Sequence, residues 1–576
     1  MSKHAIPSPW RLGLLLFFFA ACALALIARL ASLQIIQHQE FVQRAQNAHW
    51  DRRVVSAPRG AIKDREGNPL AIALSTWDIS LDPAQLKAPE NQRQAIAAVA
   101  EATGIAAGVV QQKLDQARGQ PVRIAEKLEY LRGKSLVERG VWGVVAQERI
   151  ERAYPEGSLA APLVGFLGKD GNGLTGIEAD FDRELAGVPG TLVFERDSYG
   201  SPIPLGYRSS TTPNPGGDVV LTIDRFIQRT VERELDAAMT RHKADGGTII
   251  VMEPKTGAIL AMASRPTFDL RKFDLNDPHA MEFFRNRAMT DLYEPGSTFK
   301  LFTMSAALNE GLVTPETTYV DSGPVVKYGR ALNTWDGRHY GTESMTEVLI
   351  HSNNVGAVWV SDRLERERFY SYVDKFGFGQ PTNIGLAGEA RGQVRKPAGT
   401  DWSPIDLATN AFGQGLSVTP LQLVTAASAI INGGTLMRPY VVQRIESPGS
   451  VRSFEPVSVR RVVSAEVAGQ VRSMMKAVSE QATTKAQVAG YHVGVKTGTA
   501  TIPTAGGYEV DATIASIVGF VPYENPKAVI LVKVDRPKDI PWGSQVAGPV
   551  FSALAREMLI YWRVPPTERE LVSKVN

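Results

Sequence analysis

Three short groups of residues carry a nucleophile, a base and polar partners, in one order along the chain. They are Ser297-Thr298-Phe299-Lys300, Ser352-Asn353-Asn354 and Lys496-Thr497-Gly498. A serine hydroxyl is a weak nucleophile until a base removes its proton, and a lysine three positions along a helix stands on the same face. The first group therefore indicates covalent acyl transfer, with Ser297 as the nucleophile and Lys300 as the general base.

Lys300 accepts a proton only when its amine is uncharged, so its surroundings must lower its pKa. Burial in an apolar helix and a neighbouring cation both have this effect, and Lys496 could supply the cation. Backbone amides would stabilise the developing negative charge. Those of Ser297, at a predicted helix start, and Thr499, on a predicted strand, are the expected oxyanion hole.

Residues 492–499 are predicted to form a β-strand, in which side chains alternate between two faces. Lys496 and Gly498 then share one face, and Thr497 and Thr499 share the other. Gly498 leaves its face bare, which permits close packing or a close approach of substrate. An unpaired edge of this strand could bind an extended peptide as an added strand, so a peptide substrate is expected.

Each motif alone is weak, and two of them occur twice. Ser473-Met474-Met475-Lys476 repeats the first but lies within a predicted helix, close before Lys496, which leaves no place for a middle motif. Lys255-Thr256-Gly257 falls in a predicted hairpin turn. We interpret the two as a solvated helix face and a glycine-assisted turn. For Ser352 and Asn354, between predicted helices, a capping and turn role is the alternative to a catalytic one.

The surrounding elements predict an α+β catalytic domain. Its strands are predicted at 247–252, 258–263, 492–499, 513–520 and 528–535. Helical patterns fill the middle, and a last helix is predicted from about 547 to 562. Strands at both ends of the domain imply an antiparallel sheet whose first and last strands meet, covered by helices.

A β-rich pedestal, with helical insertions near 92–102 and 106–118, is predicted to precede this domain. The run 208–217 has neither helical nor strand periodicity, which favours a linker. The chain is therefore predicted to be a multidomain α+β protein. Its predicted parts are a cytoplasmic tail (1–11), a transmembrane anchor (12–32), a dimerisation-like pedestal (33–207), a linker (208–217), a catalytic domain (218–565) and a C-terminal tail (566–576).

An unbroken apolar stretch at 12–28 is close to the minimum length of a membrane-spanning helix. It exceeds the usual signal-peptide core of roughly 7 to 15 residues, and Phe19 fits poorly in a lipoprotein signal ending at Cys22. A single anchor is therefore favoured over either kind of signal. Basic residues flank both sides, so charge does not fix the orientation, but the short segment before it favours an exported body.

Composition argues against several classes of function. The net charge of +3 gives no field strong enough to indicate a nucleic-acid partner. The eight histidines lack metal-ligand spacing, and no phosphate-binding fingerprint follows a strand, so we expect no metal, nucleotide or other cofactor. Cys22 is the single cysteine, so no intrachain disulfide is expected.

The three motifs, together with Phe412-Gly413-Gln414-Gly415 and Thr419-Pro420-Leu421-Gln422, resemble those of class B penicillin-binding proteins, most closely the division-specific FtsI type. The resemblance covers almost the whole chain. Segments that resemble the family's non-catalytic motifs are 59–65 with Gly67, 152–155 and 173–178.

The resemblance implies a penicillin-binding transpeptidase fold and a peptidoglycan D,D-transpeptidase. Ser297 would attack the penultimate D-alanine carbonyl of a stem pentapeptide, release the terminal D-alanine and pass the acyl group to an amine of a second stem. Lys300 would be the base, Ser352 a proton relay and Asn354 a substrate-orienting group. The carboxylate site would consist of Lys496, Thr497 and Thr499.

The resemblance also implies partners and a place in the cell. β-Lactams would acylate the same serine. The anchor would lie in the bacterial inner membrane with the catalytic domain in the periplasm, at the division septum. A membrane glycosyltransferase and other division proteins would be the protein partners.

Two segments depart from the family pattern. Thr499-Ala500-Thr501-Ile502-Pro503 lacks the basic residue that often follows this motif, and Trp542-Gly543-Ser544 stands where Tyr-Gly-Gly is more usual. A divergent paralogue acting mainly as a D,D-carboxypeptidase, and a division scaffold with a vestigial site, are therefore alternatives. A secreted β-lactamase would be a shorter single domain, and a β-lactam sensor would need several membrane spans.

Overall fold

The computed structural model describes residues 9–42, 50–117, 119–195, 203, 206–504 and 507–567. They belong to two compact units, one made of Met1–Pro58 and Gly187–Pro215, the other of Arg59–Ala186 and Gly216–Asn576. Most of each predicted tail, residues 1–8 and 568–576, lies outside the described residues, and the predicted domain boundaries remain a prediction.

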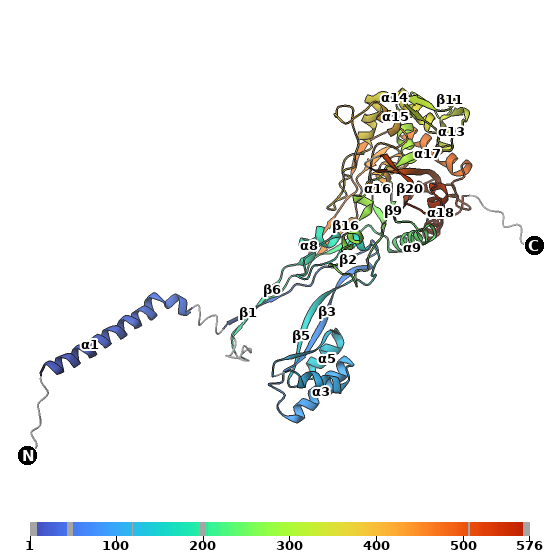
Figure 1. The fold of residues 1–576 in the computed structure, drawn as a ribbon. Coiled ribbons are helices and arrows are strands. Elements are labelled where there is room, and N and C mark those ends of the chain that lie inside the picture. The colour runs from blue at the N-terminus through green and yellow to red at the C-terminus, as the bar shows by residue number, and fades with distance from the viewer. Residues whose placement is uncertain are drawn as a thin grey trace, which may run out of the picture. The chain divides into compact units, whose positions relative to one another are not determined.

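The first unit contains one long apolar helix, α1 (Pro9–Ala31), which continues into a short π-helical turn, η1 (Ser32–Ile36). Residues Pro9–Ile36 are long and apolar enough to cross a membrane, with a mean hydropathy of 2.5 and none of the window buried. Figure 1 shows this helix. Such a length of exposed apolar surface is unfavourable in water and fits a lipid environment.

The same unit contains an antiparallel sheet in the order β1 (Trp50–Val55), β6 (Gly190–Glu195) and β7 (Arg208–Thr211). Strand β7 occupies the first part of the run 208–217, for which a linker was predicted from its lack of strand periodicity. All four β7 side chains are exposed. Because no apolar face alternates with a polar one, this strand has no period-two pattern that could be recognised in the sequence.

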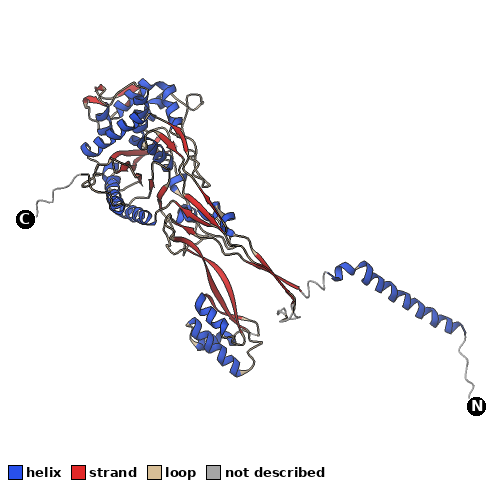
Figure 2. Ribbon diagram, turned by 180° about the vertical axis from the view of Figure 1, so that it is seen from behind, coloured by secondary structure: helices blue, strands red, loops and turns tan. Residues whose placement is uncertain are grey.

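The second unit begins with the β-rich pedestal. Long strands β3 (Pro69–Leu81) and β5 (Val144–Ala153) pair along their length and extend to a group of helices (Figures 1 and 2). The pedestal also contains β2 (Ile62–Lys63), β4 (Val122–Glu129), α3 (Pro89–Thr103), α4 (Ala107–Asp115), α5 (Tyr130–Glu138), α6 (Ala161–Val164), α7 (Gly176–Asp180) and α8 (Asp182–Ala186). Helices α3 and α4 confirm the two predicted insertions, apart from Arg118, which lies outside the described residues.

The three pedestal segments singled out in the sequence meet at one buried carboxylate. Glu178 is fully buried and accepts hydrogen bonds from Arg59 Nε at 2.7 Å and Arg152 Nε at 2.6 Å. A buried charge is tolerated when it is paired in this way, and removing one partner leaves it uncompensated. These residues therefore have a structural role within the second unit.

The catalytic half is built on an antiparallel sheet. The order of its strands is β10 (Ile259–Arg265), β9 (Gly246–Met252), β21 (Ala528–Asp535), β20 (Gly507–Val521) and β19 (Gly494–Thr504). Ile250 of β9 pairs with Leu531 of β21, so the first and last parts of the domain meet as predicted. Strands β9, β10 and β21 are almost wholly buried, and β-branched residues, which favour strands, make up at least half of β9 and β21.

Helices cover both faces of this sheet. Phe551 of α18 (Gly543–Tyr561) lies against Gly519, and Leu235 of α9 (Arg225–His242) lies against Gly247 on the same face. On the other face, Thr425 of α16 (Pro420–Ile431) contacts Met252. The predicted α+β architecture is therefore confirmed.

The remaining elements connect this core. The helices are α10 (Ala280–Phe284), α11 (Arg287–Thr290), the 3₁₀ turn η2 (Gly296–Phe299), α12 (Lys300–Asn309), α13 (Met345–Ile350), α14 (Asn354–Lys375), α15 (Ile405–Asn410) and α17 (Ala465–Gln481). The strands are β8 (Asp218–Leu221), β11 (Thr318–Asp321), β12 (Val325–Lys327), β13 (Arg330–Leu332), β14 (Gly341–Ser344), β15 (Thr435–Met437), β16 (Val442–Ser447), β17 (Ser450–Ser453) and β18 (Ser458–Arg461). Strands β8, β16 and β17 join the pedestal strands β2, β3 and β4 in one sheet.

Candidate active site

Ser297 lies in the turn that starts a buried helix, as predicted. Gly296 has φ +56°, a left-handed conformation that a glycine adopts without strain, and η2 then leads directly into α12. A Cβ added at Gly296 would lie 3.1 Å from the carbonyl oxygen of Thr499. The nucleophile turn is therefore packed closely against the backbone of β19.

Lys300 is buried, and its amine meets the side chains of the first two motifs. Nζ lies 3.0 Å from Ser297 Oγ, 2.7 Å from Asn354 Oδ1, 2.6 Å from the Ser352 carbonyl oxygen and 3.3 Å from Ser352 Oγ. A neutral amine keeps two hydrogens that it can donate to these oxygens, and its lone pair can accept the hydrogen of the Ser297 hydroxyl.

The electrostatics of Lys300 favour that neutral form. Burial is the largest effect and lowers the pKa of its amine well below the ordinary value, and the charge of Lys496 lowers the pKa further. The carboxylate of Glu343 acts in the opposite direction. The two effects expected from the sequence are therefore present, and the direction of the shift suits a general base.

Ser352 lies between α13 and α14, Asn354 is the first residue of α14, and the side chains of both face Lys300. Asn353 caps α14, with Oδ1 accepting from Gly356 N at 3.1 Å. The capping role thus belongs to the middle residue of the motif rather than to its neighbours. Asn354 Nδ2 donates to the carbonyl oxygen of Asn333 at 2.9 Å, which orients the amide so that its oxygen faces Lys300.

Lys496 extends from β19 to the same cluster and is fully buried. Its Nζ donates to Ser352 Oγ at 2.9 Å and to the Thr497 carbonyl oxygen at 3.0 Å. Burial lowers the pKa of Lys496 to about 7. The hydroxyl of Ser352 therefore lies between two lysine amines, and hydrogen bonds run without a break from Lys496 to Ser297.

β19 is the terminal strand in the order of its sheet, and its side chains alternate as predicted. Lys496 and Gly498 are buried, whereas Thr497 and Thr499 are half-buried. The Thr499 hydroxyl accepts a hydrogen bond from Gly543 N at 3.0 Å, at the start of α18. A strand at the edge of a sheet, with partly exposed threonines, can bind an extended peptide.

The bare face at Gly498 serves close packing. A Cβ there would lie 2.6 Å from Ser516 Oγ and 3.0 Å from both the Pro295 carbonyl oxygen and Thr298 Cγ2. Of the two roles expected for this glycine, the contacts thus favour packing against the nucleophile turn over the approach of substrate.

Replacing Gly498 by alanine is expected to destabilise the protein by about 1–3 kcal/mol, because two of the three atoms it would meet belong to the nucleophile turn. Gly469→Ala is the matched control. A Cβ at Gly469, in helix α17, meets nothing within 4 Å, so this variant is expected to be slightly more stable than wild type. Urea unfolding measures both, and a Gly498→Ala protein as stable as wild type would contradict the packing role.

The duplicate motifs lie outside this cluster. Ser473 is exposed on α17 and its hydroxyl contacts Tyr523 OH at 3.0 Å, while Lys476 pairs with Glu480 at 2.8 Å. Lys255 lies in the turn between β9 and β10, and its amine donates to Asn525 Oδ1 at 2.9 Å. Both duplicates thus have the structural roles predicted for them.

Sequence reasoning missed two residues beside the motifs. Asn353 was only the variable middle position of a motif, and Glu343 stood in no motif at all. Both residues are buried near Ser352, and Asn353 Nδ2 donates a hydrogen bond to Glu343 Oε2 at 2.7 Å. A carboxylate on a short strand otherwise surrounded by polar residues gives no local signal, because its partners come from other elements.

Two family models match the chain. The penicillin-binding protein transpeptidase domain covers residues 247–556, and the penicillin-binding protein dimerisation domain covers residues 54–221. The chain belongs to the class B penicillin-binding proteins. The transpeptidase match contains all three catalytic motifs, so the chain is a serine-type transpeptidase of the penicillin-binding family.

Individual relatives agree with the family match over most of the chain. Stage V sporulation protein D of Bacillus subtilis is 35% identical, covering 98% of this chain and 88% of that protein. Peptidoglycan D,D-transpeptidase FtsI of Escherichia coli K12 is 30% identical, covering 98% and 94%. The structure of penicillin-binding protein 2X from Streptococcus thermophilus aligns with a TM-score of 0.78 at 27% identity, covering 88% and 80%.

The family match and the apolar helix α1 together indicate a class B penicillin-binding protein with a single-pass membrane anchor. The predicted family and fold are therefore confirmed. A secreted β-lactamase does not account for the dimerisation domain, and the described residues contain only one helix that could span a membrane, whereas a β-lactam sensor needs several.

Proposed function

We propose that this penicillin-binding protein cross-links peptidoglycan through an acyl-enzyme on Ser297. Its Oγ attacks the carbonyl carbon of the penultimate D-alanine in a stem pentapeptide. An ester bond forms, the amide bond breaks and the terminal D-alanine leaves. The amine of a second stem then attacks the ester, forms the cross-link and frees the serine. The observation that carries this proposal is the 3.0 Å contact between Ser297 Oγ and the buried amine of Lys300.

The contacts of the two lysines support a path for the proton. Lys300 takes the hydroxyl proton of Ser297 as the ester forms. Ser352 Oγ lies 3.3 Å from Lys300 Nζ and 2.9 Å from Lys496 Nζ, so its hydroxyl can pass a proton toward the departing amine. Asn354 holds Lys300 through its Oδ1 and orients the donor peptide beside it.

The remaining roles follow from the position of β19. The backbone amides of Ser297 and Thr499 form the oxyanion hole, since the Thr499 backbone runs beside Gly296. The donor carboxylate binds at Lys496, Thr497 and Thr499. β-Lactams acylate Ser297 because they present the same carbonyl and carboxylate to these groups.

Cellular context is proposed from the relatives. Their names include a peptidoglycan D,D-transpeptidase FtsI and a sporulation protein. We assign the anchor to the bacterial inner membrane, the catalytic domain to the periplasm and the protein to septal cell-wall synthesis, with a membrane glycosyltransferase and other division proteins as partners.

Product analysis tests the reaction and separates its alternatives. Full-length protein is incubated with a stem pentapeptide and an amine acceptor, and products are resolved by mass spectrometry. Transpeptidation yields released D-alanine and a cross-linked dimer. Release of D-alanine without a dimer would favour a D,D-carboxypeptidase, and no release from protein that β-lactams do not acylate would favour a scaffold with a vestigial site.

The charge of Lys496 predicts how donor binding depends on pH. A lysine amine is cationic below its pKa, so Lys496 loses its charge as the pH rises through about 7. The KM for a donor peptide with a free carboxylate should therefore rise roughly 10- to 100-fold as the pH rises through this value. This factor corresponds to the free energy of a charge-assisted hydrogen bond. Steady-state kinetics at fixed ionic strength measure this change.

Lys496→Arg is the control for that prediction, because an arginine stays charged at every pH used. Its KM should stay level across the same interval. A wild-type KM that does not change between pH 6 and 8, roughly one unit either side of the Lys496 pKa, would remove Lys496 from the carboxylate site.

A further inference from the structure

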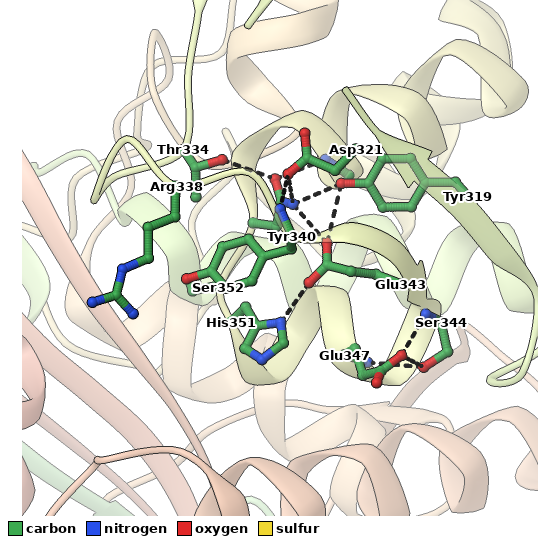
Figure 3. Close-up of polar contacts among 12 residues, drawn as sticks. Tyr319, Asp321, Thr334, Arg338, Tyr340, Glu343, Ser344, Glu347, His351 and Ser352 are labelled. Atoms are coloured by element: carbon green, nitrogen blue, oxygen red, sulfur yellow. Dashed lines mark hydrogen bonds and ion pairs between the residues drawn. The ribbon is translucent and has the colours of Figure 1, made fainter. Parts of the chain in front are cut away.

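One buried carboxylate holds the residues on both sides of Ser352. Glu343, on β14, is 2% exposed. Its Oε1 lies 2.5 Å from His351 Nδ1 (Figure 3). Its Oε2 accepts a hydrogen bond from Asn353 Nδ2 at 2.7 Å. Because a carboxylate only accepts hydrogen bonds, His351 presents an N–H at Nδ1. Ser352 therefore lies between two residues whose side chains contact the same carboxylate.

Ser352 needs such a restraint because its backbone is strained. Its φ is +55°, in the left-handed region that a residue with a side chain rarely adopts. Conformations of this kind cost about 1–3 kcal/mol and persist only where the surroundings fix them. The carbonyl of Ser352 accepts from Lys300 and its hydroxyl from Lys496. The placement of this one residue therefore determines one hydrogen bond of Lys496 and two of Lys300.

The amide of Asn353 is fully satisfied inside the network. Its Nδ2 lies 2.7 Å from Tyr319 OH, 2.9 Å from Asp321 Oδ2 and 2.7 Å from Glu343 Oε2. Two of these groups are carboxylates that accept its two hydrogens, and the Tyr319 hydroxyl is free to donate to Glu343 Oε2 at 3.3 Å. Strands β11 and β14, which carry these groups, thus clamp the turn (Figure 3).

The other side of the clamp is an aromatic stack. The ring of His351 lies on that of Tyr340, with centroids 4.2 Å apart and planes 7° apart. The backbone N–H of Tyr340 donates to Asp321 Oδ2 at 3.1 Å. Both flanking residues of Ser352 are thereby held by the same pair of strands and the loop between them.

We propose that Glu343 is a positioning residue for the acylation step, which keeps Ser352 in place by holding His351 and Asn353. It contacts neither Ser297 nor the amine of Lys300 and acts through the turn. The proposal rests on the assignment of Lys300 as the base.

The charge of Glu343 gives this role a signature in the pH profile. Glu343 raises the pKa of Lys300, against the effects of burial and Lys496. Around Glu343 itself stand His351, Asp321, Tyr319 and Tyr340. Removing its charge alone should lower the pKa of Lys300 further, so the acidic limb of acylation should move to lower pH.

Glu343→Gln in the full-length protein tests the proposal. The second-order rate of acylation by fluorescent penicillin is measured against pH. We expect the plateau rate to fall at least tenfold and the acidic limb to move to lower pH. A wild-type plateau with an unmoved limb would overturn the proposal.

Glu347→Gln, in the first turn of the following helix α13, is the matched control. Its carboxylate accepts from the backbone N–H and the hydroxyl of Ser344, both at 2.7 Å, in a capping box (Figure 3). We expect this variant to lose some thermal stability and to keep the wild-type rate and pH profile. Equal effects from Glu343→Gln and Glu347→Gln would reduce Glu343 to a structural role.

His351→Phe keeps the proposal testable if Glu343→Gln does not fold. It retains a ring to stack on Tyr340 and removes the Nδ1 donor, while the charge of Glu343 stays in place. Acylation should slow without the move of the acidic limb to lower pH. A wild-type rate in folded His351→Phe would overturn the clamp. If wild-type protein were not acylated at Ser297 at all, the proposed function would fail, whereas normal wild-type acylation with unaffected variants would remove only this inference.

Discussion

Fluorescent penicillin is expected to label the wild-type protein covalently and to leave Ser297→Ala unlabelled. The reason is geometric, because the Ser297 hydroxyl lies at the start of a buried helix and 3.0 Å from the buried amine of Lys300. Loss of the hydroxyl removes the only oxygen that we assign to ester formation, so labelling should fall to background. Fluorescence after denaturing electrophoresis measures it.

Ser473→Ala is the control for nucleophile choice. Ser473 repeats the motif spacing but lies on an exposed helix face with Lys476 paired to Glu480. This variant should be labelled like wild type. If labelling survived in Ser297→Ala and vanished in Ser473→Ala, the nucleophile would be Ser473 and our assignment of Ser297 would be wrong.

Lys300→Met is expected to slow acylation by about 10²- to 10⁴-fold, the usual contribution of a general base. Methionine fills nearly the same space as lysine but cannot accept a proton. Stopped-flow or quench measurements of acylation at neutral pH give the rate.

The stability of Lys300→Met is the control for a folding defect. Because folding lowers the pKa of Lys300, the folded protein binds a proton there less strongly than the unfolded chain does. Burying this lysine therefore costs stability below the unfolded pKa, and the cost shrinks as the pH rises toward it. Methionine removes the cost, so the thermal midpoint at pH 7 should not fall substantially. A collapsed midpoint with a normal rate per folded molecule would remove the catalytic role.

Local patterns in the sequence were sufficient for the main parts of the site. The spacing of Ser297 and Lys300 on a helix fixes their contact, because residues three apart share a face. The alternation of β19 likewise places Lys496 and Gly498 on the buried face. The meeting of β9 and β21 followed from strands at both ends of a domain that must share one core.

Other features depend on partners that are distant in the sequence. β7 has four exposed side chains and is a strand only because β6 supplies its hydrogen bonds. Glu343 has its role because it contacts His351, at the end of α13, and Asn353, at the start of α14. Gly498 could serve packing or substrate, and only the position of the nucleophile turn favours packing. No periodicity along the chain encodes such contacts.

The pH dependence of acylation at Ser297 tests the central claim most directly, namely that a neutral Lys300 amine activates this hydroxyl. Wild-type protein is acylated with a β-lactam at a series of pH values, and the adduct on the Ser297 peptide is quantified by mass spectrometry. At a saturating concentration of β-lactam, we predict an adduct at Ser297 whose rate stays high well below the ordinary lysine pKa and declines at more acidic pH. An adduct on another residue, or a rate that rises only near the ordinary lysine pKa of about 10.4, would contradict it.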